Sequence, residues 1–396
     1  MSEKSMKVDM VGTARNVQWT PEVFLGHGSL KLVAPAKVNL FLAVGDKRAD
    51  GYHEVVNIMH ALALHDTLYV HAGPVARGSA EEGYLEKAAC LAAEAAARVA
   101  GTAEVEPSAC ADQNVSRETF VCDNAGADAR RTDAELPDYY AIVGPEKNIL
   151  VYVDAVDKGG VGELDVPARD NIATKAVDAL ACAVGRTVRE KVAVRLEKNV
   201  PHQGGLGGGS SDAAAVLVGL ARLWGLSADD PAVERVARVL GADVAFFLNG
   251  GCAQFEGAGE KLVRTLPARK DAVLLIKPEG GVSTPAAYAA FDEEPTLVPA
   301  EAMQAALSAQ SASEVPLVNN LAPAAERLMP ELAEVRAWAN AQLGVRHAML
   351  CGSGATTFAV VDDFATACEL AAAAQLKGWW ARATMMSSLK AAVRPK

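Results

Sequence analysis

The chain has 396 residues, of which 51% are hydrophobic and 22% charged, so it is long enough for two domains with substantial cores. Its formal net charge of -11 disfavours general binding to nucleic acid or to an anionic membrane surface. The sequence shows neither an uncharged apolar run of about 18 residues nor a secretory-type apolar core near Met1, so we expect a cytoplasmic globular protein.

The first half of the chain predicts strands, one helix and an insertion. Residues 29–72 alternate apolar and polar residues around the turn-like DKRADG, as strands do. Residues 80–100 are rich in alanine, leucine and glutamate and predict a helix, whereas 101–145 is polar and has no clear period. We therefore expect an insertion at 75–145. The pattern resumes with a strand at NILVYVDAV, a helix at DNIATKAVDALACAVG and a strand at KVAVRLEKNV.

The second half predicts further helices and a separate domain. Asp230 as N-cap, Pro231 at the first helical position and Gly241 just beyond the end delimit one helix, and Asp243 is expected in the short segment after it. From about 268 we expect a strand at AVLLIKP, helices near 299–309 and 323–341, a strand-loop-strand unit at HAMLCGSGATTFAVV, and a helix from 364. The expected divisions are an N-terminal extension (1–28), a first domain (29–265) and a second domain (266–396).

The seven cysteines are scattered, odd in number and without a C-x-x-C pair. This pattern argues against a disulfide framework and against a zinc site, and it favours buried, unpaired thiols.

The most unusual stretch places five glycines in the six positions from Gly204 to Gly209, between a predicted strand and a predicted helix. The first turn of a helix has up to four amide N–H groups without intrahelical partners and suits an anion, and glycines let the backbone approach that anion closely. The stretch has neither the G-K-[ST] ending of a P-loop nor the G-x-G-x-x-G spacing. A flexible connector is the alternative, but the strand-loop-helix context favours a phosphate site.

The segment P-x-x-x-G-L-G-G-G-S-S-D-A-A-A (201–215) resembles the ATP-phosphate loop of the GHMP kinases. The segments APAKVNLFLAVGDKRADGYHEV (34–55) and LCGSGATTFAV (350–360) resemble the first and third motifs of that superfamily. Together with GADVAFFLNGGCAQFEGAGE and GVSTPAAYAAFD, they are similar to the branch whose acceptor is 4-diphosphocytidyl-2-C-methyl-D-erythritol. The resemblance implies an α+β, two-domain fold with the active site in the cleft between the domains and an insertion in the first domain.

By this resemblance, Lys37 and Asp243 face the acceptor hydroxyl. Asp243 would act as the base, while Lys37 would hold Asp243 ionised and steady the acceptor oxygen. Outside these motifs, Lys37 would be read as a surface lysine at a strand edge and Asp243 as a helix-end or turn aspartate.

The resemblance also implies residues that bind the nucleotide and the acceptor. ATP is expected with Mg²⁺ arriving on it, since the sequence has no dedicated carboxylate cage. The expected nucleotide-binding residues are Asn171, Lys198, Gly204, Gly205, Leu206, Gly207, Gly208, Gly209, Ser210 and Ser211. Lys198 is read equally well as a solvated charge at a strand end.

On the acceptor side, Tyr52 would stack on the pyrimidine and His53 would hydrogen-bond the Watson–Crick edge of cytosine. Tyr288 would cover the opposite ring face, and Asn39 would either position the substrate or serve as a structural hydrogen-bond partner. Substrate phosphates would be supported by Gly352, Ser353 and Gly354, with structural tightness as an equal reading of the glycines.

The expected activity is ATP-dependent phosphorylation of the 2-hydroxyl of that acceptor, in the non-mevalonate route to isoprenoid precursors. The expected partner is therefore a small molecule linked to cytidine diphosphate, with no nucleic acid and no membrane, and the protein is expected as a monomer or homodimer. Two alternatives stay open, another GHMP small-molecule kinase and a nucleotide-binding protein without catalysis.

Overall fold

The computed structural model describes residues 28–101, 136–227 and 229–394. In these ranges one sheet has nine strands: β1 (Leu30–Lys47), β2 (His53–Gly73), β3 (Tyr140–Val143), β4 (Ile149–Asp157), β5 (Glu190–Lys198), β6 (Cys252–Glu256), β7 (Lys261–Leu266), β9 (Val318–Asn319) and β13 (Ala392–Val393). A second sheet has four: β8 (Ala272–Lys277), β10 (Val345–Leu350), β11 (Thr357–Val361) and β12 (Trp380–Met385).

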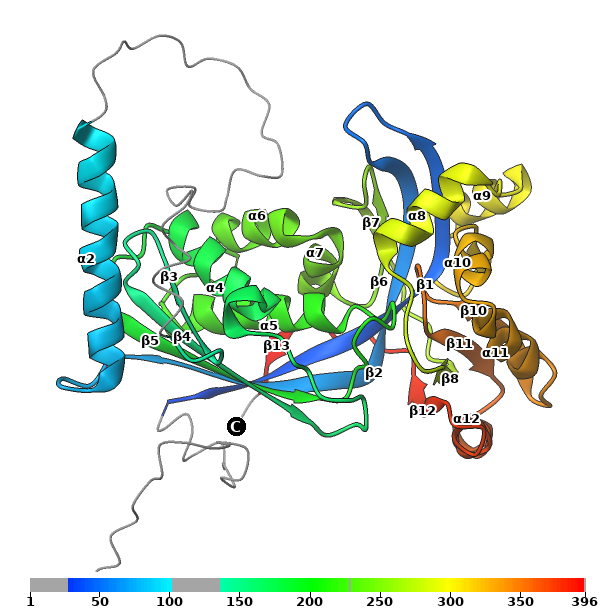
Figure 1. The fold of residues 1–396 in the computed structure, drawn as a ribbon. Helices are drawn as coiled ribbons and strands as arrows, with labels where there is room; N and C mark the ends of the chain where they lie inside the picture. The colour runs from blue at the N-terminus through cyan, green and yellow to red at the C-terminus, as the bar shows by residue number, and fades with distance from the viewer. Residues whose placement is uncertain (1–27, 102–135, 228, 395–396) are drawn as a thin grey trace, which may run out of the picture.

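The helices divide between the two sheets (Figure 1). Those that accompany the large sheet are α2 (Ala80–Gly101), the 3-10 turn η3 (Ala168–Asp170), α4 (Ile172–Ala183), α5 (Gly208–Leu223), α6 (Pro231–Leu240) and α7 (Ala242–Asn249). The later ones are α8 (Thr284–Glu293), α9 (Ala300–Ser308), α10 (Ala322–Leu328), α11 (Glu331–Asn340) and α12 (Phe364–Gln375). Within the described residues, we find no helix with the length and apolar character needed to cross a membrane.

The long β1–β2 hairpin is the framework that both halves share. Its register shifts between Pro35 and Lys37 and again between Asn39 and Phe41. Such irregularities re-aim side chains, and proline, which lacks an N–H, fits at one. The motif around Lys37 is therefore the place where the hairpin departs from regular pairing.

The large sheet carries its helices on one face (Figure 1). Its central order is β13-β1-β2-β5-β4-β3, and β4 and β5 run parallel because α4 connects them. Alanine-rich faces of α4 and α5 pack closely on this sheet, and Phe246 and Phe247 of α7 complete the same core. This packing fixes the start of α5, where the glycine stretch ends.

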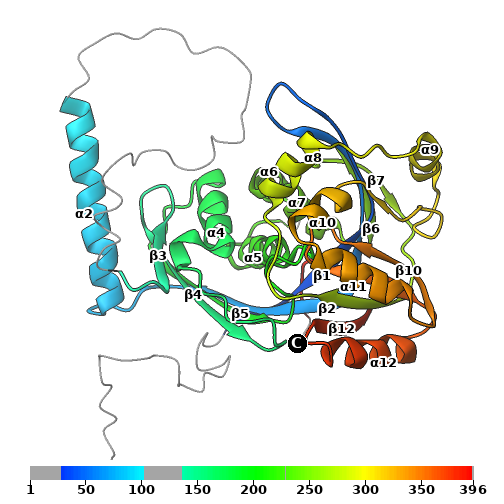
Figure 2. The same cartoon turned by 45° about the vertical axis from the view of Figure 1, so that its right-hand side comes forward.

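The small sheet lies between helices and the hairpin (Figure 2). On one face, Leu274 and Ile276 of β8 pack with residues of α11 and α12. On the other face, Val273 and Leu275 share a core with Val38 of β1. Because strand side chains alternate between faces, β8 joins the later helices to the first half of the chain.

Most elements predicted from the sequence are present, with three differences. Asp243 lies in the first turn of α7, a helix that the sequence did not predict, rather than in a connecting segment. The predicted helix at 323–341 is two helices, α10 and α11, because the chain breaks at Pro330. Tyr140–Val143, inside the predicted insertion, forms the edge strand β3.

The structure also bears on the predicted domain division, the predicted extension and insertion, and the cysteines. The small sheet begins after residue 266, yet β9 and β13 return to β1, so the domain division stays a prediction. Most of the N-terminal extension and residues 102–135 of the insertion lie outside the described residues. Cys252 and Cys351 are buried thiols as expected. Cys90 and Cys368 are exposed thiols and Cys182 is disulfide-bonded, contrary to the expectation.

Candidate active site

The glycine stretch forms a tight loop that leads into α5. Gly207 is the N-cap with φ of 72°, and no side chain caps the helix. A Cβ on Gly207 would lie 2.8 Å from the Phe247 ring and 3.1 Å from Cγ of Lys37, so only glycine lets the loop approach both. The Ser211 hydroxyl in the first turn is fully buried and has no hydrogen-bond partner in the described structure.

Backbone hydrogen bonds tie this loop to both sheets. The Lys37 N–H of β1 donates to the Leu206 carbonyl at 2.9 Å. From the loop between β10 and β11, Ala355 N–H donates to the Gln203 carbonyl at 3.3 Å and Thr356 N–H to the Gly204 carbonyl at 3.1 Å. The second and third predicted motifs are therefore neighbours, although 150 or so positions of sequence separate them.

Lys37 and Asp243 come together beside this loop. The Lys37 ammonium lies 3.7 Å from a carboxylate oxygen of Asp243. The Lys37 side chain is 4% exposed and that of Asp243 33% exposed, so the pair opens to solvent on the Asp243 side. Asp243 is in the first turn of α7, where the helix dipole favours a negative charge. The two residues predicted to be catalytic thus form one site.

Asn39 fixes the lysine from the other side. Lys37 Nζ donates to Asn39 Oδ1 at 2.8 Å, and Asn39 Nδ2 donates to Asn57 Oδ1 at 2.8 Å. All three side chains are buried. Of its two predicted roles, Asn39 therefore fills the structural one, while substrate positioning stays a prediction. A Cβ added to Gly352 would come 3.5 Å from Asn39 Oδ1, so the third motif also borders this cluster.

A cavity of about 390 Å³ lies beside the loop. Its lining includes eight of the ten predicted nucleotide-binding residues: Asn171, Lys198, Gly204, Gly205, Gly207, Gly208, Gly209 and Ser210. The Leu206 side chain is buried in the core instead, so this residue offers only backbone groups. Asn171 is the N-cap of α4, where its Oδ1 accepts from Ala173 N–H at 2.9 Å.

Lys198 is buried in an ion-pair cluster, so its reading as a solvated strand-end charge is wrong. Its ammonium donates to one carboxylate oxygen of Asp66 and to one of Asp212. Burial opposes the charge, but Asp212 and Asp66 outweigh it, and the pKa of Lys198 is raised. Burial, together with the Asp66 carboxylate, raises the pKa of Asp212 to about 7.

A second group of polar side chains joins the hairpin to α8. His53 Nε2 lies 2.6 Å from Asp292 Oδ1, and the His53 and Tyr288 ring centroids are 5.2 Å apart. Burial and the Asp243 carboxylate raise the pKa of Tyr288 to about 12, so its phenol stays protonated at neutral pH. Tyr52, in the turn before β2, is 48% exposed.

Comparisons with protein families and with known proteins identify relatives of this chain. Residues 171–251 match the model for the GHMP kinases N terminal domain, and residues 300–378 match that for the GHMP kinases C terminal. The chain is 30% identical over 344 residues to a 4-diphosphocytidyl-2-C-methyl-D-erythritol kinase of Pelotomaculum thermopropionicum, covering 86% of this chain and 92% of the relative. An enzyme of the same name from Mycolicibacterium gilvum is 32% identical over 351 residues, covering 86% and 82%.

The chain belongs to the GHMP kinase family. A crystal structure of 4-(cytidine 5'-diphospho)-2C-methyl-D-erythritol kinase matches this kinase with a TM-score of 0.58 and 28% identity, covering 90% of this chain and 100% of that one. The expected α+β, two-domain GHMP kinase fold is therefore confirmed, and so is the resemblance to the branch named for that acceptor.

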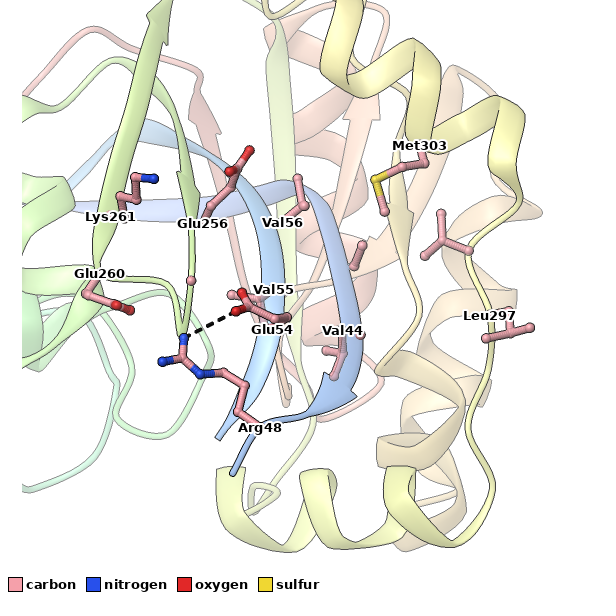
Figure 3. Close-up of a pocket in the computed structure, with 14 residues that line it drawn as sticks. Val44, Arg48, Glu54, Val55, Val56, Glu256, Glu260, Lys261, Leu297 and Met303 are labelled. Carbon is pink, nitrogen blue, oxygen red and sulfur yellow. Dashed lines mark hydrogen bonds and ion pairs between the residues drawn. The ribbon is translucent and has the colours of Figure 1, made fainter. Parts of the chain in front are cut away.

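A larger cavity in this kinase, of about 720 Å³, has neither Lys37 nor Asp243 in its lining; Figure 3 shows the residues that line it. It is bounded by the β1–β2 hairpin, the β6–β7 turn and the chain before and at the start of α9. Arg48 points toward Glu54 there, with 3.4 Å between the charged groups. None of the predicted site residues lines this larger cavity.

Three residues that contact predicted site residues were not themselves predicted from the sequence. Asp66 stands in the apolar run ALALHDTLYV, where a charged residue in a strand was a usable signal. Asp212 was part of the quoted motif but had no assigned role. Asp292 carried no local signal, because its contact with His53 depends on how α8 packs against the hairpin.

Proposed function

We propose that this protein transfers the γ-phosphoryl group of ATP to the 2-hydroxyl of 4-diphosphocytidyl-2-C-methyl-D-erythritol, a step toward isoprenoid precursors. The observation that carries the proposal is the meeting of Lys37 and Asp243 next to the glycine loop. The names of the relatives supply the acceptor. Cytoplasmic location and a monomeric or homodimeric state stay predictions.

The residues around the loop suit a nucleotide triphosphate. The backbone from Gly207 to Ser210 borders the cavity of about 390 Å³, and no side chain caps the first turn of α5, so its amide N–H groups suit phosphate oxygens. We propose that Gly204 to Ser211 hold the phosphates while Lys198 and Asn171 border the base and ribose. Among the described residues, no three His, Cys, Asp or Glu side chains form a metal cluster. In this proposal, Mg²⁺ would enter with ATP and offset charge on the phosphate oxygens.

The proposed reaction is a direct in-line displacement. The acceptor hydroxyl loses its proton to Asp243 as its oxygen forms a bond to phosphorus, and the bond from phosphorus to the ADP oxygen breaks. The Lys37 ammonium steadies the acceptor oxygen, and its bond to Asn39 keeps it there. On the acceptor, Tyr52, His53 and Tyr288 would hold the cytosine, and Gly352 to Gly354 would lie near the substrate phosphates.

The test is an assay with ATP and a panel of acceptors, using ADP release as the readout. We expect turnover of the cytidyl acceptor, and we expect Asp243→Asn to lower kcat by about 10²–10⁴-fold. A nucleotide-binding measurement on the same variant should give unchanged ATP affinity. Preference for another acceptor would identify a different GHMP small-molecule kinase. Equal inactivity of wild type and variant toward every acceptor would favour a nucleotide-binding protein without catalysis.

A further inference from the structure

His53 is held on three sides. It is the first residue of β2, and its side chain is 5% exposed. One ring neighbour is Tyr288 at 5.2 Å, and Phe291 meets it edge-on at 6.1 Å. Its Nε2 lies 2.6 Å from Asp292 Oδ1. Among the described residues we find no hydrogen-bond partner for the other ring nitrogen, Nδ1, so this atom is the one left for a ligand.

Asp292 is shared between this histidine and a lysine. Its second oxygen, Oδ2, accepts from Lys47 Nζ at 2.8 Å, and Lys47 pairs with His53 across the β1–β2 hairpin. The hydrogen bonds from Lys47 and from His53 hold the pKa of Asp292 below its ordinary value. An ionised carboxylate only accepts hydrogen bonds, so the proton of a neutral His53 must sit on Nε2.

This assignment determines what Nδ1 can recognise. With hydrogen on Nε2, Nδ1 of the neutral ring is an acceptor. Cytosine presents a donor at its exocyclic amine, whereas a uracil ring presents a carbonyl acceptor at the same position. The two pyrimidines therefore differ at the atom that Nδ1 would meet.

We propose that Asp292 is a positioning residue that sets the tautomer of His53 and thereby makes the site select cytosine over uracil. This inference rests on the proposed function, because it takes the acceptor's base to lie at His53. Asp292 does not touch the base itself. It acts from α8 through the imidazole, as a carboxylate does when it fixes the orientation of a histidine ligand.

The experiment compares the cytidyl acceptor with the same molecule carrying uracil, at about pH 8 so that an ordinary imidazole is neutral. In Asp292→Asn, the amide can donate to Nε2 and leave hydrogen on Nδ1, which then suits the uracil carbonyl. We expect the ratio of kcat/KM values, cytosine over uracil, to fall about tenfold or more, with the change mainly in KM. Lys47→Met is the matched control, since it removes the other partner of Asp292 and should leave the ratio unchanged.

The outcomes separate the two proposals. If wild type phosphorylates neither acceptor, the proposed function fails. If wild type turns over the cytidyl acceptor and Asp292→Asn keeps the wild-type ratio, the role of Asp292 is refuted while the function stands. Long-range ¹H–¹⁵N correlations of the His53 ring in wild type provide a second readout that needs no variant. Hydrogen on Nε2 supports the inference, and hydrogen on Nδ1 overturns it.

Discussion

Asp212 should make the folded protein less stable as the pH rises. It lies in the first turns of α5, 3% exposed, with Oδ2 bonded to Lys198 and Oδ1 unpartnered. Burial raises its pKa to about 7, and the nearby Asp66 carboxylate adds to the rise. An unfolded aspartate ionises near about pH 3.9. Between these two values the folded state binds more protons than the unfolded state, so the free energy of unfolding falls with rising pH.

The size of the effect follows from the two pKa values. At about pH 5.5 the folded carboxyl is still largely protonated, and at about pH 8 it is largely ionised. Linkage gives a loss of about 2 kcal/mol of stability from this group between those conditions. Asp212→Asn cannot ionise, and its amide can still accept from Lys198 and donate toward Asp66. The variant should therefore lack this part of the pH dependence.

Urea denaturation at the two pH values measures the difference. We compare the free energy of unfolding of Asp212→Asn minus that of wild type at each pH. We expect this difference to be about 2 kcal/mol larger at the higher pH, because only wild type loses stability as the pH rises. Asp46→Asn makes the same substitution at an exposed residue of β1 and should show no such change. If Asp212→Asn follows wild type at both pH values, the assigned protonation of the buried cluster is wrong.

Two further substitutions test the loop and the lysine support. Gly205→Ala would place a Cβ against the Cys351 carbonyl oxygen, at a residue whose φ is 72°. We expect it to lower the free energy of unfolding, measured by urea denaturation, by about 2–3 kcal/mol. Gly209→Ala, whose Cβ would meet nothing closer than 3.6 Å, is its control, and equal losses would contradict the packing of the two loops. Asn57→Leu removes the acceptor of Asn39 and should lower kcat about tenfold with the KM for ATP unchanged. An unchanged kcat would show that Lys37 does not need this support.

The sequence alone was enough to predict many of the local elements, and it carried the three motifs, but it did not indicate β6, β7, α8 or β12. Alternation predicted the β1–β2 hairpin, and the Asp230, Pro231 and Gly241 signals predicted the ends of α6. These features depend on residues that are close together in the sequence, so the sequence pattern is enough to predict them. The helix α7 was missed because its eight residues are too few to show a helical period.

Long-range packing is what the sequence did not reveal. The resemblance indicated that Lys37 and Asp243 share a site, but nothing in the sequence placed Asn57 behind Asn39 or Asp66 beside Lys198. These contacts depend on strand register and on how α5 packs on β2. A one-residue shift of register would turn each of those strand side chains to the other face.

The packing also links the proposed base, Asp243, to the glycine loop. Asp243 is on α7, and the Phe247 ring of that helix would lie 2.8 Å from a Cβ on Gly207. The loop is bonded in turn to Lys37 of β1 and to the β10–β11 loop. The proposed base, Lys37 and the glycine loop are therefore joined by direct packing and backbone hydrogen bonds. In phosphoryl transfer most of the catalytic effect comes from positioning. In the proposed mechanism, the α5–α7 contact would therefore set the position of Asp243 relative to the glycine loop.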